Sequence, residues 1–329
     1  MKLITEQQFS NFTNFVSSHD AFIIAGHKEP DGDCIASSLA LGNLLRTYNK
    51  PILIINEGPF KRPETKKFEK YFAADIKPLT SKKERTGLFI VDCSETQRIG
   101  DLAQKIQNFD TFIIDHHKTG KGDPKSSIID PLSPATAYLI QQIYEHECDT
   151  IPEETAKILF LGISTDTGFF RFLDSSSSEI FKALARLVEA GASPRKTYDY
   201  ITSGKPFNTR KLLGIMLDRA EQYFDGRLII TYEKMSDTRK LAKEGRDSDA
   251  LYSMLLTVEN VEAVVFIRQE SLTHCTVGLR SKDMIDVSAI ASVFGGGGHK
   301  NASGLSTKAK IDTLKPQIIK EFSKIFQNN

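Results

Sequence analysis

The 329-residue chain has no apolar run that approaches the ~20 residues of a membrane-spanning helix. Its first ten residues, MKLITEQQFS, reach charged and amide side chains before an export signal could form. The net charge is only +1, so the chain lacks the basic excess of proteins that coat long nucleic acids. We therefore expect no membrane partner and no long nucleic-acid partner, while a small anionic substrate stays open.

Cysteine is scarce and tryptophan is absent. The four cysteines are far apart and form no C-x-x-C pair: Cys34, Cys93, Cys148 and Cys275. A chain of this size does not need disulfides to be stable, so this usage favours reduced thiols in the cytoplasm and does not support a zinc-cysteine site. Nothing follows from the missing tryptophan.

Apolar residues make up 40% of the chain and charged residues 26%, which is ordinary for a globular protein. A length above roughly 250 residues predicts two domains. We expect a first domain over residues 1–191, a linker and connecting helix over 192–222, and a smaller second domain over 223–329.

In the first domain, continuous apolar runs alternate with helical patterns. Such runs indicate strands buried on both faces, as in a parallel sheet. The predicted strands are 21–26, 51–56, 87–92 and 111–116, and the predicted helices are 34–48, 134–147, 152–165 and 175–191. The fold class is therefore α/β, with a doubly wound, mainly parallel sheet, and residues 192–207 break the pattern as a connection.

The second domain has a different order of strand and helix patterns, which also predicts an α/β arrangement. A strand is expected at 227–233, and a hairpin is formed by VEAVVFIRQ (261–269) and THCTVGLRS (273–281). A helical segment at 285–294 leads into GGGGHKNASG (295–304), and a helix at 310–327 follows.

Polar residues that can bind metal ions follow the predicted strands of the first domain. They are His27, Asp31 and Asp33 after the first strand, Asp92 after the third, Asp115, His116 and His117 after the fourth, and Asp166 at the end of a helix. In open α/β sheets, ligands bind beyond the carboxyl ends of the strands, near a topological switch point. We therefore expect these side chains to meet at one edge of the sheet.

Each of these residues alone has a simpler interpretation. A single Asp at a strand end is more often a helix cap, and a single His is more often a satisfied polar residue. Together they favour a metal centre, and their oxygen-rich character suits Mn²⁺ or Mg²⁺. The set is too large for one ion but suits two ions ~4 Å apart, a pair that can activate water and hold a phosphoryl group.

These motifs resemble those of the DHH-superfamily phosphoesterases. HKEPDGD, VDCSETQRIG, IIDHHKTG and STDTGFFRF correspond to its four motifs in order, and GGGGHKNASG resembles the motif of the DHH-associated C-terminal domain. The subfamily with that domain includes the oligoribonucleases and pAp phosphatases called nanoRNases. Two departures occur in this chain: Cys34 and Ala36 replace a small residue and a glycine, and Ala137-Tyr138 replaces a frequent acidic residue.

The resemblance implies a role for each residue of the centre. One ion would be held by His27, Asp31 and Asp92, and the other by Asp33, Asp92, His116 and Asp166. His117 would lie beside the scissile phosphate as a catalytic residue, with Asp115 orienting the histidine pair. The implied cofactors are two divalent ions, with Mn²⁺ first and Mg²⁺ or Co²⁺ as alternatives.

The glycine run 295–298 has two interpretations. It is either a flexible turn or, as we favour, a cradle whose backbone N–H groups bind an anion. By resemblance it would bind the end of the substrate remote from the metals, and the expected substrate-binding residues are Arg280, Ser281, Gly296, Gly297, Gly298, His299 and Asn301. Arg98 and Arg171 are weaker candidates, and the basic run 61–70 is most simply a solvated face.

The expected protein is a two-domain phosphohydrolase with its active site in the cleft between the domains. By resemblance, its substrates are short oligoribonucleotides, 5′-phosphorylated linear dinucleotides such as pApA and pGpG, and pAp. The alternatives are a cyclic-dinucleotide phosphodiesterase, an inorganic pyrophosphatase or exopolyphosphatase, and a non-catalytic nucleotide sensor. The oligomeric state stays open, with a homodimer as one option.

Overall fold

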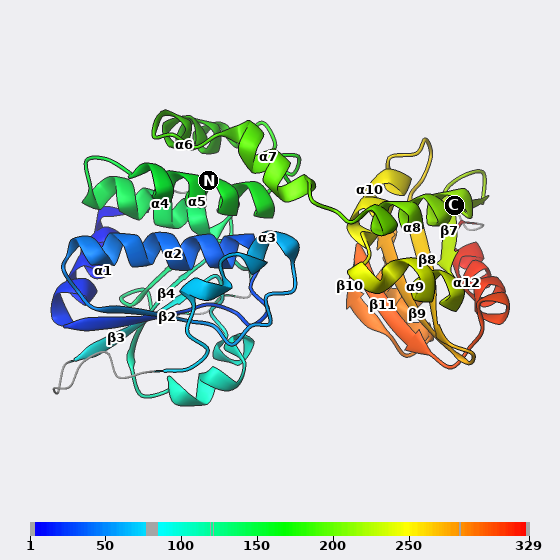
Figure 1. Cartoon of the computed structure of the whole chain (residues 1–329), viewed down its shortest axis with the longest axis horizontal. Helices are drawn as coiled ribbons and strands as arrows, with labels where there is room; N and C mark the ends of the chain where they lie inside the picture. The colour runs from blue at the N-terminus through cyan, green and yellow to red at the C-terminus, as the bar shows by residue number, and fades with distance from the viewer. Residues whose placement is uncertain (1–3, 77–84, 119, 121, 283, 327–329) are drawn as a thin grey trace. The chain divides into compact units, whose positions relative to one another are not determined.

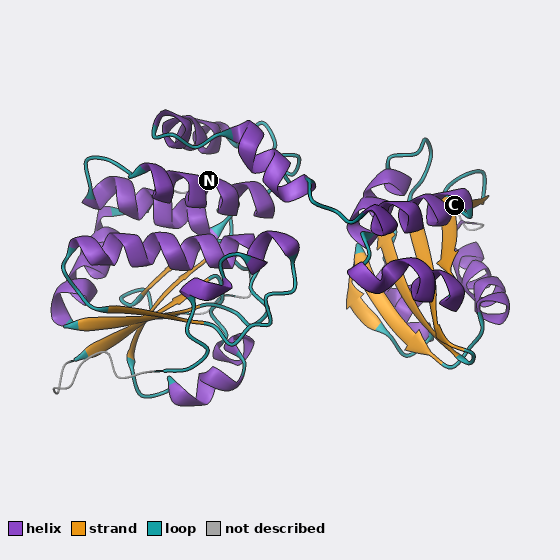
Figure 2. Cartoon of the chain, in the orientation of Figure 1, coloured by secondary structure: helices purple, strands orange, loops and turns teal. Residues whose placement is uncertain are grey.

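The computed structural model describes residues 4–76, 85–118, 120, 122–282 and 284–326. The chain divides into two compact units, Met1–Ser203 and Gly204–Asn329 (Figure 1). Both units combine helices with a sheet (Figure 2), so the predicted α/β class is confirmed. The domain boundaries predicted from the sequence stay a prediction, although residues 192–222 are shared between these two units. None of the described helices is both long enough and apolar enough to cross a bilayer.

A five-stranded parallel sheet forms the centre of the first unit. Its strands are β1 (Ala21–Ala25), β2 (Ile52–Ile55), β3 (Thr86–Val91), β4 (Asp110–Asp115) and β5 (Ser127–Ile129). Their order in the sheet is β2-β1-β3-β4-β5, and every pair is parallel. All of β1 is buried, as its continuous apolar sequence predicts. The four predicted strands are therefore confirmed, and β5 is an addition.

The two faces of this sheet are covered differently. One face packs against α1 (Glu6–Ser18), α2 (Gly32–Thr47) and α4 (Thr136–Glu147). Two further helices, α5 (Glu153–Asp166) and α6 (Ser178–Glu189), pack on these helices rather than on the sheet. The opposite face packs against two short 3-10 helices, η2 (Thr96–Ile99) and η3 (Asp101–Lys105). The unit also contains α3 (Pro63–Lys66), η1 (Glu69–Tyr71) and α7 (Pro194–Thr202).

Residues 192–207, where the pattern predicts a connection without regular structure, instead contain α7. The hydroxyl of Ser193 accepts a hydrogen bond from the backbone N–H of Lys196, and Pro194 occupies the first helical position. These are ordinary helix-start features. No residue of α7 is fully buried, which explains why the apolar pattern did not predict a helix here.

The second unit is built on a six-stranded mixed sheet. Its strands are β6 (Glu221–Tyr223), β7 (Leu228–Glu233), β8 (Ala263–Ser271), β9 (His274–Ser281), β10 (Gly297–His299) and β11 (Ala302–Thr307), in the order β10-β11-β9-β8-β7-β6. Its helices are α8 (Phe207–Asp218), α9 (Met235–Leu241), η4 (Ala242–Glu244), α10 (Ser248–Leu256), α11 (Val287–Val293) and α12 (Ile311–Phe326). The predicted hairpin is confirmed as β8 and β9.

Alternating side chains of this sheet enter two separate cores. Ile230 and Val265 pack on the side of α11 and α12, while Ile229 and Val264 pack on the side of α8 and α10. This follows from the two-residue period of a strand, which turns successive side chains to opposite faces. Both faces of the sheet are therefore covered by helices.

The second half of the glycine run belongs to the sheet, while Gly295 and Gly296 precede the strand. Gly297 and Gly298 form β10, which pairs with β11 in antiparallel register. A Cβ atom on Gly296 would lie 2.3 Å from the carbonyl oxygen of Gly304, and one on Gly298 would lie 2.6 Å from that of Ala302. These two glycines are required because the chain approaches β11 too closely for a side chain.

Three helices of the first unit meet at Gly162 in α5. A Cβ atom there would lie 2.5 Å from the Cβ of Ala36 in α2 and 2.8 Å from the Cβ of Ala137 in α4. Ala36 and Ala137 each carry only a methyl group. Their small side chains let α2, α4 and α5 pack together at this point.

Gly162→Ala should therefore destabilise the protein by about 1–3 kcal/mol, because the added methyl group overfills the contact. The matched control is Gly214→Ala in α8, where an added Cβ meets nothing within 4 Å. That control should be neutral or stabilising by ~0.5–1 kcal/mol, since alanine favours helix more than glycine does. Calorimetric unfolding measures both changes, and equal stability of Gly162→Ala and the wild type would contradict the packing argument.

Candidate metal centre

The candidate metal centre lies at the carboxyl edge of the parallel sheet. The strand order places β1 between β2 and β3, so the direction of winding reverses at β1. His27 follows β1, Asp92 follows β3, and His116 follows β4. The strands are parallel and in register, with Ala25 opposite Ile90 and Val91 opposite Ile114. Their ends therefore bring the three side chains together at a topological switch point, where α/β proteins bind ligands.

Local backbone structure sets the positions of Asp31, Asp92 and Asp166. Asp31 is the N-cap of α2, and its side chain accepts hydrogen bonds from the N–H groups of Asp33 and Cys34. Asp92 has a φ of 60°, a left-handed conformation that Asp adopts more readily than most residues. Asp166 is the last residue of α5. The residue before it, Thr165, lies against Gly32 at the start of α2.

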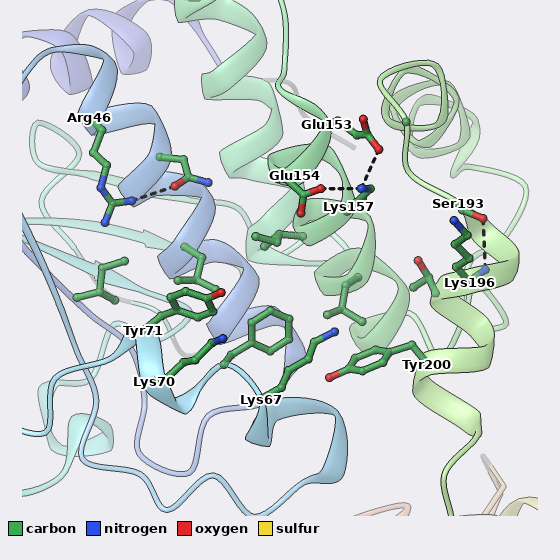
Figure 3. A pocket seen from close by; sticks show the side chains of 18 residues that line it. Arg46, Lys67, Lys70, Tyr71, Glu153, Glu154, Lys157, Ser193, Lys196 and Tyr200 are labelled. Carbon is green, nitrogen blue, oxygen red and sulfur yellow. Dashed lines mark hydrogen bonds and ion pairs between the residues drawn. The ribbon is translucent and has the colours of Figure 1, made fainter.

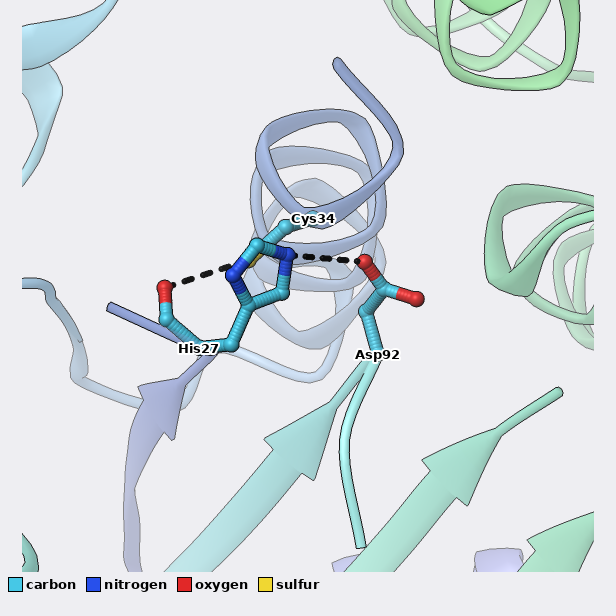
Figure 4. Close-up of side chains that lie close together, drawn as sticks. All are labelled: His27, Cys34 and Asp92. Carbon is cyan, nitrogen blue, oxygen red and sulfur yellow. Dashed lines mark hydrogen bonds and ion pairs between the residues drawn. The ribbon is translucent and has the colours of Figure 1, made fainter. Parts of the chain in front are cut away.

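Asp92 directs its two oxygens towards different histidines. Its Oδ2 lies 3.4 Å from Nε2 of His27, and its Oδ1 lies 3.6 Å from Nε2 of His116. Figure 4 shows Asp92 at the end of its strand beside the ring of His27. The remaining carboxylates of the centre lie beside one or the other of these two histidines.

Asp31 Oδ1 lies 3.7 Å from His27 Nε2. On the other side, Asp33 Oδ2 and Asp166 Oδ2 lie 3.9 Å and 3.1 Å from His116 Nε2. The ligand atoms of Asp33, His116 and Asp166 all lie within 4.8 Å of one another. The structure thus brings together all six residues predicted as ligands, in two groups that share Asp92.

His117 differs from His116 in its partner. Its Nδ1 lies 2.7 Å from Oδ1 of Asp115, which is fully buried. A carboxylate accepts hydrogen bonds, so Nδ1 carries the hydrogen and Nε2 remains for another contact. Asp115 also accepts a hydrogen bond from the backbone N–H of His117, which fixes the position of the ring.

The centre concentrates negative charge away from water. Asp33 and Asp92 are 0% and 1% exposed. Burial, together with the charges of Asp92 and Asp166, raises the pKa of Asp33 well above its usual range. Burial alone would lower the pKa of His116, but the hydrogen bond that its ring donates to Asp166 and the charges of Asp33 and Asp92 raise it to about 10.

The pKa of His27 is raised in the same way, with the effect of burial outweighed by Cys34, Asp31 and Asp92. An environment that holds protons so strongly on its histidines would also stabilise a divalent cation. The donors are carboxylate oxygens and imidazole nitrogens, which suit hard or borderline divalent ions. The residues present therefore fit a metal centre.

The start of α4 supports this cluster, and the sequence pattern did not predict it. The backbone N–H groups of Thr136 and Ala137 donate to the two oxygens of Asp33 over 2.7 and 2.8 Å. The hydroxyl of Thr136 donates to Oδ1 of Asp92 over 3.1 Å. The sequence does predict a helix that starts here, but it does not indicate that the helix points at Asp33.

Cys34 also lies beside His27 and Asp92. Burial raises the pKa of its thiol to about 11, which keeps the sulfur protonated in the absence of a metal. A Cβ atom on Gly26 would lie 2.2 Å from its Sγ atom, so the thiol fills the space next to β1. Cys34 therefore contributes packing at this position.

The second unit has a pocket of about 450 Å³ that contains two of the predicted substrate-binding residues, Arg280 and Gly297. The guanidinium carbon of Arg280 lies 4.7 Å from the centre of the Tyr252 ring. Arg268 and Thr276 also line the pocket. The combination of two arginines and an aromatic ring can bind an anion and a planar group.

Other predicted substrate-binding residues lie outside that lining. The hydroxyl of Ser281 donates to the carbonyl oxygen of Ile285 over 2.7 Å, and the amide of Asn301 donates to the carbonyl oxygen of Ser281 over 3.3 Å. Gly298 and His299 lie on β10, next to Gly296. Arg98 belongs to the first unit and is exposed on η2. Their proposed roles stay predictions.

Comparison with known families accounts for both units. Residues 21–163 match the DHH family, N-terminal domain, and residues 225–328 match the DHHA1 domain. The chain belongs to the DHH family of phosphoesterases. More narrowly, it is a member that carries a DHHA1 domain.

Two curated proteins are similar to this chain over most of its length. The bifunctional oligoribonuclease and PAP phosphatase NrnA of Thermus thermophilus is 29% identical over 87% of this chain and 83% of that protein. The cyclic-di-AMP phosphodiesterase PdeA of Listeria monocytogenes is 25% identical over 92% of this chain. The chain spans only 47% of that second relative.

Solved structures agree on the fold. An exopolyphosphatase-related protein from Bacteroides fragilis superimposes with a TM-score of 0.82 and 22% identity, covering 99% of both chains. An exonuclease RecJ bound to manganese has a TM-score of 0.52 and 14% identity, covering 100% of this chain and 97% of that one. These likenesses support the α/β fold of both units.

Thr136→Val should weaken Mn²⁺ binding by about 10- to 100-fold, because it removes the hydroxyl that orients Asp92 while keeping the side-chain shape. Thr136→Ser keeps the hydroxyl and should bind nearly as the wild type does. Titration calorimetry with Mn²⁺ measures all three proteins. If the Val and Ser variants bound Mn²⁺ equally well, the hydrogen bond to Asp92 would have no orienting role.

Proposed function

We propose that the protein hydrolyses short oligoribonucleotides and 5′-phosphorylated linear dinucleotides, such as pApA and pGpG, to mononucleotides. The same centre would release phosphate from pAp. The proposal includes two divalent ions, with Mn²⁺ preferred. It rests most on one observation, which is that Asp92 divides its two oxygens between His27 and His116.

A carboxylate shared in this way suits a pair of ions rather than a single ion. His27, Asp31 and Asp92 would hold one ion, and Asp33, Asp92, His116 and Asp166 the other. When bound, such a pair lowers the pKa of a water molecule and stabilises negative charge on a phosphoryl group.

The remaining residues of the centre would act on the substrate and its surroundings. His117, oriented by Asp115, has one ring nitrogen left to bind or protonate an oxygen of the scissile phosphate. Thr136 and the N-terminus of α4 would hold Asp33 and Asp92 in place as charge changes during the reaction. Asp33 and Asp92 are buried, so bulk water has little access to their carboxylate oxygens.

The second unit would select the substrate. Its pocket around Arg280 and Tyr252 offers a cation and a ring, which suit a terminal phosphate and a base. We propose that Gly296, Gly297, Gly298, His299, Asn301 and Ser281 shape this region. This division of tasks agrees with the predicted domains, in which residues 1–191 carry the metals and residues 223–329 bind the substrate.

The similarity to the NrnA of Thermus thermophilus supports short oligoribonucleotides and pAp as substrates. A second candidate activity is the hydrolysis of a cyclic dinucleotide, because the chain is also similar to the Listeria phosphodiesterase that acts on cyclic-di-AMP. Both substrates would use the same centre. They differ in whether the pocket of the second unit receives a free terminal phosphate.

A panel of substrates tests the proposal directly. With Mn²⁺ present, pApA, pGpG and a 3-mer RNA should be cleaved faster than cyclic-di-AMP, pyrophosphate or a 24-mer RNA. Asp92→Asn should abolish all hydrolysis, since an amide cannot serve two ions, and it should stay folded because Asn also adopts a positive φ. Near-normal turnover by Asp92→Asn would remove the two-metal assignment, and preferential cleavage of pyrophosphate would replace the proposed substrate class.

Arg280→Ala should lower kcat/KM for pApA by about 10- to 100-fold, the range expected for one charge-assisted contact worth about 1.5–3 kcal/mol. Hydrolysis of bis-p-nitrophenyl phosphate, which needs only the metal centre, should be unchanged. The matched control is Arg239→Ala on the exposed surface of α9. A parallel loss with both substrates would show that Arg280 acts on the fold rather than on the nucleotide.

A further inference from the structure

A second pocket lies in the first unit, away from the metal centre. Its volume is about 920 Å³, and its walls come from α2, α5, α7 and the α3-η1 segment (Figure 3). None of the six proposed metal ligands lines it. Its size falls within the range of pockets that bind small molecules, which is roughly 300–1,000 Å³.

The pocket has an excess of positive charge. Five cationic side chains line it, whereas Glu153 and Glu154 are its two acidic side chains: the cations are Arg46, Lys67, Lys70, Lys157 and Lys196. Lys157 already pairs with both glutamates over 2.7 and 2.6 Å. The excess is local, since the whole chain has a net charge of only +1.

Three of these cations have no carboxylate partner within hydrogen-bonding distance among the described residues. Arg46 donates to the amide oxygen of Asn43 over 2.9 Å. Lys67 lies with its Nζ atom 3.5 Å from the centre of the Tyr200 ring, and Lys70 lies 5.1 Å from the centre of the Tyr71 ring. Such cations are available to a bound anion.

Aromatic rings complete the lining. Tyr200 is held in place by its hydroxyl, which donates to the carbonyl oxygen of Glu64 over 2.6 Å, and its face contacts the Lys67 ammonium. Partial burial lowers the pKa of Lys67, as expected for an ammonium group that has lost some of its water. Tyr71 is 55% exposed, so its ring is accessible for stacking with a planar group. A planar ring and an anion can therefore be bound together.

We propose that this pocket binds a nucleoside monophosphate, with its phosphate on Lys67 and Lys70 and its base against Tyr71. The site goes beyond the proposed hydrolysis, because none of the six proposed metal ligands lines it. A nucleoside monophosphate is also the class of product that the proposed reaction would release. Leu39 and Asn43 of α2 and Leu161 of α5 line the pocket, and the same helices carry Asp33 and Asp166 of the metal centre.

The absence of tryptophan makes a direct test simple. Tyr71→Trp places a single indole at the rim of the pocket, in a chain with no other tryptophan emission. AMP is titrated in EDTA, so that the metal centre is not loaded, and with Arg280→Ala present, so that the pocket of the second unit is weakened. We expect a saturable change in emission. The control reporter, Leu272→Trp on the exposed β8–β9 turn, should show none.

Adding Lys67→Met to the reporter should weaken AMP binding by about tenfold or more, because one charge-assisted contact is lost. Lys66→Met, at a neighbouring lysine that does not line the pocket, should leave the affinity unchanged. Saturation-transfer NMR with AMP on the chain without a reporter repeats the measurement without any change at Tyr71. These experiments do not depend on hydrolysis, so they separate failure of this site from failure of the proposed function.

Three outcomes would overturn the proposal. The first is the absence of saturable AMP binding in both the emission and the NMR experiments. The second is equal affinity for adenosine and AMP, which would remove the role of the phosphate. The third is equal affinity for inorganic phosphate and AMP, which would remove the role of the base.

Discussion

Asp33 and Asp92 carry like charges and are almost completely removed from water at one edge of the parallel sheet. Two buried carboxylates in one cluster are stable only if positive charge or hydrogen-bond donors compensate them. In this protein, His27 and His116 supply ion-pair contacts, and the first turn of α4 supplies N–H groups. The organisation of the first unit follows from this need for compensation.

The fold meets that need with parallel strands and close helix packing. The strands end at a common edge, so residues far apart in the chain become neighbours. The helices that follow then start or end at the same place, with Asp31 capping α2 and Asp166 ending α5. Gly162, between Ala36 and Ala137, is the contact that lets these helices lie close enough.

Much of this arrangement could be predicted from the sequence, because it depends on local patterns. Continuous apolar runs indicated four strands of the sheet, and the D-H-H and D-x-D spacings indicated which side chains would meet. The contribution of Thr136 could not be predicted, since the direction in which α4 points is decided by tertiary packing. α7 was missed because none of its residues is fully buried.

The basic run 61–70 and the glycine run 295–298 show what tertiary contacts add to a local sequence pattern. Most of the run 61–70 is exposed, as expected of a solvated face, and Lys67 in addition lies over the ring of Tyr200, which is more than a hundred residues away in the chain. In the glycine run, the close approach to β11 accounts for Gly296 and Gly298, and the anion cradle stays a prediction. The contact between Lys67 and Tyr200 joins segments that are distant in the chain, and a local pattern carries no information about it.

The N-terminus of α4 affects how the proposed metal centre would behave when no ion is bound. Its N–H groups bind both oxygens of Asp33, so part of the charge compensation is built into the backbone and does not leave with a cation. These contacts would hold Asp33 in place whether or not the proposed ions are bound, so loading would require little rearrangement at this residue. Such a protein would lose and regain the proposed metals without unfolding, and its proposed activity would follow the supply of ions in its surroundings.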